Sequence, residues 1–228
     1  MPQHGARLWL VRHGETDWNA QGRVQGHTPT SLNHRGRHQA HALAAALQHK
    51  PFAALYSSDL PRAAETAAII AQGRNLPITL TPALRERSFG IYEGQSSAAI
   101  RDARTALGLP QTGDLADWTG MPGIESEAQL WARIDPCLRQ ISAAHPDQDV
   151  LIATHGGVLA RALYHTLAIP EGLPRRFALS NGIIAILQWR SDHYYLLSLI
   201  DPALLAGSSP TIDTATGSDL PPTPPQDT

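Results

Sequence analysis

Arginine and histidine side chains stand where two apolar runs of the sequence end. The first apolar run leads directly to Arg12 and His13, and the run 149–154 leads directly to His155. A further cationic residue, Arg62, lies near the start of a segment rich in helix formers. An arginine can hold two phosphoryl oxygens at once, and a histidine ring can donate a hydrogen bond or attack as a nucleophile. These residue types indicate phosphate chemistry, provided that the fold brings them together.

Alternating strands and helices are predicted to position these side chains. Short apolar runs predict strands, and segments with helical periodicity separate them. The predicted strands are 6–11, 52–58, 78–80 and 149–154, followed by a hairpin of 183–189 with 194–200; the predicted helices are 33–50, 60–72, 125–145 and 155–169. This alternation predicts a three-layer α/β/α fold with a mostly parallel sheet. Because parallel strands end at one edge of a sheet, we expect the four cationic or imidazole side chains to meet there.

Helix starts add anion-binding groups to that edge. Asp59 is expected to cap a helix that has Pro61 in its first turn, which would place Arg62 in the same turn. Gly156 and Gly157 begin the helix after the strand 149–154, and their free backbone N–H groups suit an anion. A pocket of this composition holds phosphate without a metal ion.

Composition limits the classes of protein and partner. The chain has 228 residues, 42% of them hydrophobic and 17% charged, which suits one compact domain with at most a small cap. The net charge of -2 provides no basic surface field, so we expect no nucleic acid and no membrane as partners. No apolar run reaches the roughly 20 residues of a membrane span. The single cysteine, Cys137, is interpreted as core packing, and the absence of a signal-peptide pattern predicts a cytoplasmic protein.

The chain is predicted to form one domain over residues 1–201. Residues 90–125 contain several glycines and prolines and are interpreted as a small lid insertion. Residues 202–228 are rich in Ser, Thr, Pro, Gly and Asp and contain no aromatic residue, so we expect a disordered tail.

The sequence LVRHGETDWN at 10–19 resembles the signature of the histidine phosphatase superfamily, in its phosphoglycerate mutase-like branch. Further blocks resemble the family in the same order and extend the resemblance over roughly residues 7 to 200. These blocks are GRVQGHTPTSLNHRGRHQA, SSDLPRAAETAAII, LRERSFGIYEG, PGIESEAQLWARI, ATHGGVLARAL and LSNGIIAIL. One of them reads GIES where phosphatase members commonly have GGES.

The resemblance implies a role for each matching residue. His13 would be the nucleophile and Glu86 the proton donor. The residues implied to hold the transferring phosphoryl group are Arg12, Arg62 and His155, and those implied to contact substrate are Asn19, Gln25, Gly26, Arg87 and Gly156. Phosphoryl transfer depends mainly on positioning and on stabilising charge at the equatorial oxygens, which such a set supplies. Neighbouring arginines should keep His13 uncharged and its lone pair available.

Three functions remain open at this point, and hydrolysis of small phosphomonoesters is favoured. A phosphoglycerate mutase would need cations for a carboxylate and a second phosphate, and it would need a 2,3-bisphosphoglycerate primer. Arg87 matches a position that mutases use against the carboxylate, but Arg101 and Arg104 are the only basic residues in 91–126. The third hypothesis is a non-catalytic module that binds phosphorylated ligands; the presence of every implied catalytic residue argues against it.

Neither a metal site nor a cofactor is expected. His34, His38 and His41 share one face of a predicted helix, but no carboxylate or cysteine joins them at a suitable spacing. A polar, exposed helix face explains the same pattern. The expected partner is a small phosphomonoester, and the sequence leaves open whether the protein is a monomer or a homodimer.

Overall fold

A six-stranded sheet is the central element of the computed structural model, which describes residues 5–109, 118, 120–170, 173 and 175–202. The strands are β1 (Arg7–Arg12), β2 (Ala54–Ser57), β3 (Ile78–Leu80), β4 (Asp149–Thr154), β5 (Ile184–Arg190) and β6 (His193–Ile200). Their order is β3-β2-β4-β1-β5-β6. The pairings β1–β4, β2–β4 and β2–β3 are parallel, whereas β5 pairs antiparallel with β1 and β6. The predicted mostly parallel sheet is confirmed.

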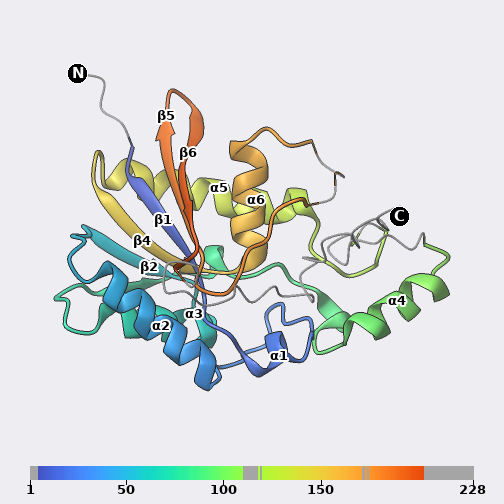
Figure 1. Cartoon of the computed structure of the whole chain (residues 1–228). Coiled ribbons are helices and arrows are strands. Elements are labelled where there is room, and N and C mark those ends of the chain that lie inside the picture. The colour runs from blue at the N-terminus through green and yellow to red at the C-terminus, as the bar shows by residue number, and fades with distance from the viewer. Residues whose placement is uncertain (1–4, 110–117, 119, 171–172, 174, 203–228) are drawn as a thin grey trace, which may run out of the picture.

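Helices cover both faces of this sheet (Figure 1). The α-helices are α1 (Asp17–Ala20), α2 (His34–Leu47), α3 (Pro61–Ala71), α4 (Ser97–Ala106), α5 (Glu127–Ala144) and α6 (Gly156–Thr166), and the 3-10 turns are η1 (Pro82–Leu84) and η2 (Gly90–Tyr92). Helices α5 and α6 pack on one face, and α2 and α3 pack on the other. The predicted three-layer arrangement is therefore confirmed.

The alternation of side chains along the strands divides the core into two layers. Leu8 and Leu10 of β1 contact the α5–α6 layer, while Val11 contacts the α2–α3 layer. Every residue of β4 is buried, because this strand lies between β1 and β2 with helices on both faces. Strand β4 is thus held in place on all sides, and its carboxyl end carries His155.

Two local features differ from the sequence prediction. Asp59 does not cap α3: the N-cap is Leu60, which makes no side-chain cap hydrogen bond, and Asp59 instead accepts a hydrogen bond from Arg85 Nε at 2.7 Å. The arginine offers the carboxylate two charge-assisted hydrogen bonds, which outweigh a single helix cap. The loop after β1 also contains the short helix α1, which begins with a capping box between Thr16 and Asn19.

The predicted lid insertion includes η2 and α4, which project away from the sheet (Figure 1). A separate cluster of buried apolar side chains forms there, and it includes Val24, Tyr92, Ile100 and Trp118. Residues 110–117 and 119 of the predicted lid, and 203–228 of the predicted tail, lie outside the described residues. Within the described part of the chain, no helix has the length and apolar character that a membrane crossing requires.

Candidate active site

The carboxyl ends of β1, β2 and β4 bring the predicted site residues together. Arg12 is the last residue of β1 and His13 follows it, while His155 follows β4 and is the N-cap of α6. Arg62 lies in the first turn of α3, directly after β2. The pocket at this edge is lined by Arg12, His13, Asn19, Arg23, Val24, Gln25, Gly26, Arg62, Glu86 and Phe89. The lining comes from four segments that are distant in sequence, 12–13, 19–26, 62 and 86–89, and meets at the edge expected from the parallel sheet. His155 is not among the described residues that line the pocket, but its ring contacts that of His13.

The imidazole of His13 is buried and held by the backbone. Its Nδ1 atom lies 2.7 Å from the carbonyl oxygen of Gly14, and because a carbonyl only accepts, Nδ1 carries the proton. The other nitrogen, Nε2, therefore keeps its lone pair, which accepts a hydrogen bond from Arg62 Nε at 3.2 Å. Burial, followed by the positive charges of Arg62 and Arg12, lowers the pKa of His13 well below its ordinary value. His13 is thus a neutral imidazole with a lone pair inside a cationic pocket.

Two buried arginines flank that lone pair. Arg62 is fully buried and donates to the carbonyl oxygens of Gly26 at 2.7 Å and Thr28 at 3.0 Å. Burial lowers the pKa of Arg62 to about 10, so its guanidinium stays charged at neutral pH. Arg12 is 1% exposed and donates through Nη1 to the carbonyl oxygen of Leu179. Carbonyl oxygens orient both guanidinium groups, and the charges of Glu86 and Glu93 also act on Arg62. Two arginines in one pocket favour an anionic ligand.

His155 lies beside His13, with 5.2 Å between the ring centroids. Its Nε2 atom is 2.8 Å from Ser58 Oγ, and among the described residues its buried Nδ1 atom has no hydrogen-bond partner. Burial is the largest cause that lowers the pKa of His155, and the charge of Arg62 adds to it. The ring is therefore neutral as well, with Nε2 oriented by Ser58.

Glu86 reaches the pocket from the loop after η1. Its two carboxylate oxygens accept hydrogen bonds from the backbone N–H groups of Arg87 at 2.8 Å and Gly157 at 3.0 Å. Each oxygen keeps a further lone pair that can take a proton. The contact with Gly157 depends on the absence of a side chain, because a Cβ atom there would lie 2.2 Å from Glu86 Oε1.

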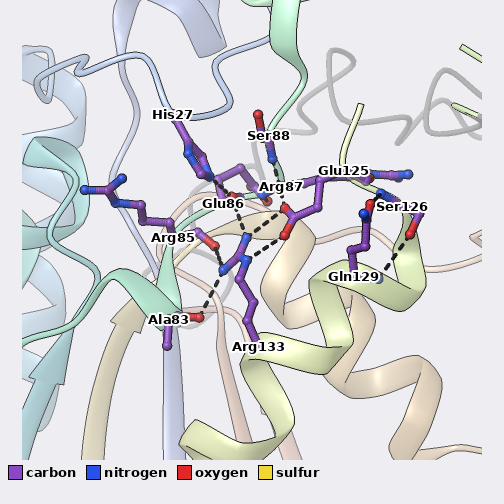
Figure 2. Close-up of polar contacts among 10 residues, drawn as sticks. All are labelled: His27, Ala83, Arg85, Glu86, Arg87, Ser88, Glu125, Ser126, Gln129 and Arg133. Atoms are coloured by element: carbon purple, nitrogen blue, oxygen red, sulfur yellow. Dashed lines mark hydrogen bonds and ion pairs between the residues drawn. The ribbon is translucent and has the colours of Figure 1, made fainter. Parts of the chain in front are cut away.

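An ion pair between Arg133 of α5 and Glu125, two residues before that helix, holds the loop that carries Glu86 (Figure 2). Arg133 donates to the carbonyl oxygen of Glu86 at 2.8 Å and to that of Arg85 at 2.7 Å, and it pairs with Glu125 at 2.7 Å. Glu125 in turn accepts a hydrogen bond from the N–H of Ser88 at 3.0 Å. The Glu86 carbonyl also contacts His27 Nε2 at 2.8 Å (Figure 2). The loop is therefore fixed by charge-assisted hydrogen bonds on both sides of Glu86.

The predicted substrate-contacting residues fall into two groups. Asn19, Gln25 and Gly26 line the pocket, and Gly26 has a φ of +52°, which suits glycine. Arg87 and Gly156 are not among the described residues that line it. Arg87 Nε donates to the Glu125 carbonyl oxygen, and Gly156 packs against the guanidinium of Arg12.

Several residues near the pocket received no role from the sequence. Arg23, Val24 and Phe89 also line it, and Asn181 donates to the carbonyl oxygen of His13 at 2.9 Å. Ser58 contacts His155, as described above. All five lie inside family-like blocks, so block membership was the available signal. Within the described part of the chain, no group of three or more His, Cys, Asp or Glu residues is arranged to hold a metal ion.

Comparison with known proteins gives consistent matches to one family. Residues 8–202 match the model of the histidine phosphatase superfamily, branch 1. The chain is 33% identical to the adenosylcobalamin/alpha-ribazole phosphatase of Salmonella typhimurium over 178 residues, which cover 77% of this chain and 87% of that protein. It is 38% identical to a metal-independent phosphoserine phosphatase of Arabidopsis thaliana over 211 residues, covering 86% and 82%.

A solved structure supports the same relationship. The fold resembles that of a mycobacterial glucosyl-3-phosphoglycerate phosphatase in complex with VO3, with a TM-score of 0.70 and 30% identity. The match covers 84% of this chain and 96% of the mycobacterial chain. The similarity thus extends over nearly the whole of the described fold, including every segment that contributes to the pocket.

Proposed function

The chain belongs to the histidine phosphatase superfamily, branch 1, and we propose that it hydrolyses small phosphomonoesters through a phosphohistidine at His13. The observation that carries the proposal is the state of His13: Nδ1 donates to the Gly14 carbonyl oxygen, so the lone pair is on Nε2, inside a buried pocket and hydrogen-bonded to Arg62 Nε at 3.2 Å. A phosphoryl group that binds Arg62 would replace this hydrogen bond and leave Nε2 facing phosphorus. Arg12 and Arg62 supply the positive charge that a phosphoryl group requires. The similar phosphatases named above act on alpha-ribazole, phosphoserine and glucosyl-3-phosphoglycerate esters, which are all small phosphorylated compounds.

In the first step, Nε2 of His13 attacks phosphorus as the bond to the ester oxygen breaks. The new bond joins phosphorus to Nε2, and the electron pair of the broken bond goes to the leaving oxygen. Arg12, Arg62 and His155 hold the three equatorial oxygens and stabilise their charge. A proton from the Glu86 carboxyl group passes to the leaving oxygen and releases a neutral alcohol.

In the second step, water attacks the phosphohistidine. Glu86, now a carboxylate, takes a proton from that water while the bond between phosphorus and Nε2 breaks. Inorganic phosphate leaves, the lone pair returns to Nε2, and Glu86 is again protonated. The arginines oppose a positive charge on His13, which makes the uncharged ring a good leaving group.

We propose that residues 90–125 act as a lid that sets substrate preference. Phe89 lines the pocket directly before this segment, and its ring contacts Trp118 at 4.7 Å between centroids. A pocket lined by both arginines and an aromatic ring suits a phosphate group attached to a larger organic part.

The decisive experiment measures phosphate release from a panel of phosphomonoesters in EDTA, with wild type and His13→Ala compared. The exposed His38→Ala on α2 is the matched histidine control. We expect hydrolysis that survives EDTA, is lost in His13→Ala and is unchanged in His38→Ala. Rapid quenching with labelled substrate should trap acid-labile phosphate on His13. Hydrolysis that depends on a metal, or that persists in His13→Ala, would overturn the proposal.

The same assay separates the two other functions. Addition of 3-phosphoglycerate with and without the 2,3-bisphosphoglycerate primer tests the mutase alternative. Primer-dependent isomerisation with negligible phosphate release would show that the protein is a mutase and not a phosphatase. Absence of both reactions, with retained binding of a phosphorylated ligand, would identify a binding module.

A further inference from the structure

Ser58 lies between β2 and α3 and is completely buried. Its backbone N–H donates to the carbonyl oxygen of Ala153 at 3.0 Å and so continues the pairing of β2 with β4. Its hydroxyl group makes two contacts: it accepts from the N–H of Leu60 at 3.2 Å and lies 2.8 Å from Nε2 of His155. The side chain is therefore fixed between the start of α3 and the ring of His155.

These contacts determine which atom carries the proton. The hydroxyl oxygen of Ser58 already accepts one hydrogen bond, from Leu60, and its own proton needs an acceptor. Among the described residues, the acceptor in contact with that hydroxyl is Nε2 of His155. Ser58 then donates to Nε2, and because a neutral imidazole has one N–H group, that group must be at Nδ1.

The Nδ1 atom of His155 is buried and, within the described residues, has no hydrogen-bond partner. A buried N–H group without an acceptor costs free energy, so a native protein keeps one chiefly where a ligand completes the bond. The ring lies beside His13, with centroids 5.2 Å apart. An oxygen of a phosphoryl group bound to His13 would supply the missing acceptor.

We propose that Ser58 is a positioning residue that fixes His155 as the Nδ1–H tautomer and thereby makes it a neutral hydrogen-bond donor to the phosphoryl group. The inference rests on the proposed function for the identity of the ligand. The two imidazoles then share one tautomer but have opposite tasks: His13 presents a lone pair from Nε2, whereas His155 presents a proton from Nδ1. The carbonyl oxygen of Gly14 selects the first arrangement, and the hydroxyl of Ser58 selects the second.

The tautomer is measured directly, in the free protein and without substrate. Long-range proton–nitrogen NMR spectra of protein labelled with nitrogen-15 in histidine distinguish Nδ1–H from Nε2–H. We expect Nδ1–H for His155 in wild type and a mixed or Nε2–H population in Ser58→Ala. Added vanadate should shift the Nδ1 signal of wild type. An Nε2–H ring in wild type, or an unchanged ring in Ser58→Ala, would overturn the proposal whether or not the protein is a phosphatase.

Kinetics test whether this orientation matters to the reaction. Loss of one preorganised donor should lower kcat of Ser58→Ala by about tenfold to a hundredfold. Ser57→Ala is the matched control, because Ser57 is equally buried but donates to a backbone carbonyl oxygen, and its kcat should be unchanged. Ser58→Thr keeps the hydroxyl group and should recover part of the loss.

A double-mutant cycle assigns the effect to His155. If Ser58 acts through that ring, Ser58→Ala should cause no further loss of kcat in a His155→Ala background. Fully additive losses, or an equal loss in Ser57→Ala, would show that the variant merely disturbs the packing between β2 and α3. Wild-type protein that lacks phosphatase activity but shows the Nδ1–H ring would refute the proposed function and leave the tautomer assignment intact.

Discussion

At the amino ends of β1 and β4, the buried charge of Asp149 is neutralised by its neighbours. Asp149 accepts hydrogen bonds from Arg7 at 2.7 Å and Trp9 at 2.8 Å, and it pairs with Lys50 at 2.8 Å. Burial alone would raise the pKa of this carboxyl group, but the three donors outweigh it and hold the pKa well below its ordinary value. Charge at this edge is matched within the protein.

At the carboxyl ends of the same strands, charge is buried in a different setting. The buried guanidinium of Arg62 is hydrogen-bonded to backbone carbonyl oxygens, the charges of Glu86 and Glu93 act on it, and both nearby imidazoles are kept neutral. In the matched edge, around Asp149, cations contact the carboxylate directly, whereas in the cationic edge, around Arg62, we propose that the arginines bind the phosphoryl group of a substrate. Substitutions at the two edges should accordingly separate stability from activity.

Arg62→Met should give the largest effect. We expect kcat/KM to fall by about 10³-fold, because the guanidinium stabilises charge that develops in transfer. The free energy of unfolding should change by about 1 kcal/mol or less, since removal of a buried charge offsets the lost hydrogen bonds to Gly26 and Thr28. Steady-state kinetics and urea unfolding measure the two quantities. A loss of several kcal/mol in stability would mean that Arg62 resembles the matched edge after all.

Gly157→Ala should have the next largest effect on activity. The new methyl group would lie 2.2 Å from Glu86 Oε1 and would displace the Glu86 carboxyl group. We expect kcat to fall by about 10²-fold, the scale of a lost general acid. In a Glu86→Gln background, Gly157→Ala should cause no further fall in kcat, because the Glu86 carboxyl group is already absent. A further fall of about 10²-fold in that background would instead indicate damage to α6.

Asp149→Asn should reverse the pattern by reducing stability without changing kcat. Removal of the carboxylate leaves Arg7 and Lys50 without their partner, and we expect the free energy of unfolding to fall by about 2 kcal/mol, because both cations are partly solvated. Chemical denaturation gives this value, with the exposed Asp147→Asn as control. A fall in kcat would show that the two edges are coupled through the strands.

The smallest expected effects are in the pH dependence of the free energy of unfolding, which should differ between the two edges. His13 and His155 have lowered pKa values in the fold, so below about pH 6.5 the unfolded chain binds protons that the native state excludes. Stability therefore falls with decreasing pH in this range, by about 1.4 kcal/mol per pH unit for each ring. The lowered pKa of Asp149 contributes stability above the ordinary carboxyl range, and this is lost below about pH 4.

Variants assign each pH range to one edge. His13→Ala should reduce the slope between about pH 5 and 6.5, and Asp149→Asn should remove part of the loss below about pH 4. Urea midpoints measured across the pH range provide the test. A slope below pH 6.5 that is the same in wild type and His13→Ala would contradict the neutral state assigned to that ring.

The sequence by itself determined the elements and the edge at which they meet. Apolar runs end at Arg12 and at Thr154, Asn33 caps α2, and Pro61 begins α3, so interactions within a few residues set these boundaries. Parallel pairing then places the ends of the strands at one edge, and the family-like blocks predicted the residues that meet there.

Only the tertiary structure decided how those residues are oriented. Ser58 and His155 are 97 positions apart, and the carbonyl oxygen of Glu86 is held by Arg133, 47 positions away. Asp59, expected to cap a helix, instead pairs with Arg85. Local propensity acts over about one helical turn, whereas these partners are chosen by which side chains the packed layers bring within hydrogen-bond distance. Residue type therefore predicted the kind of site, and packing decided how its side chains are oriented.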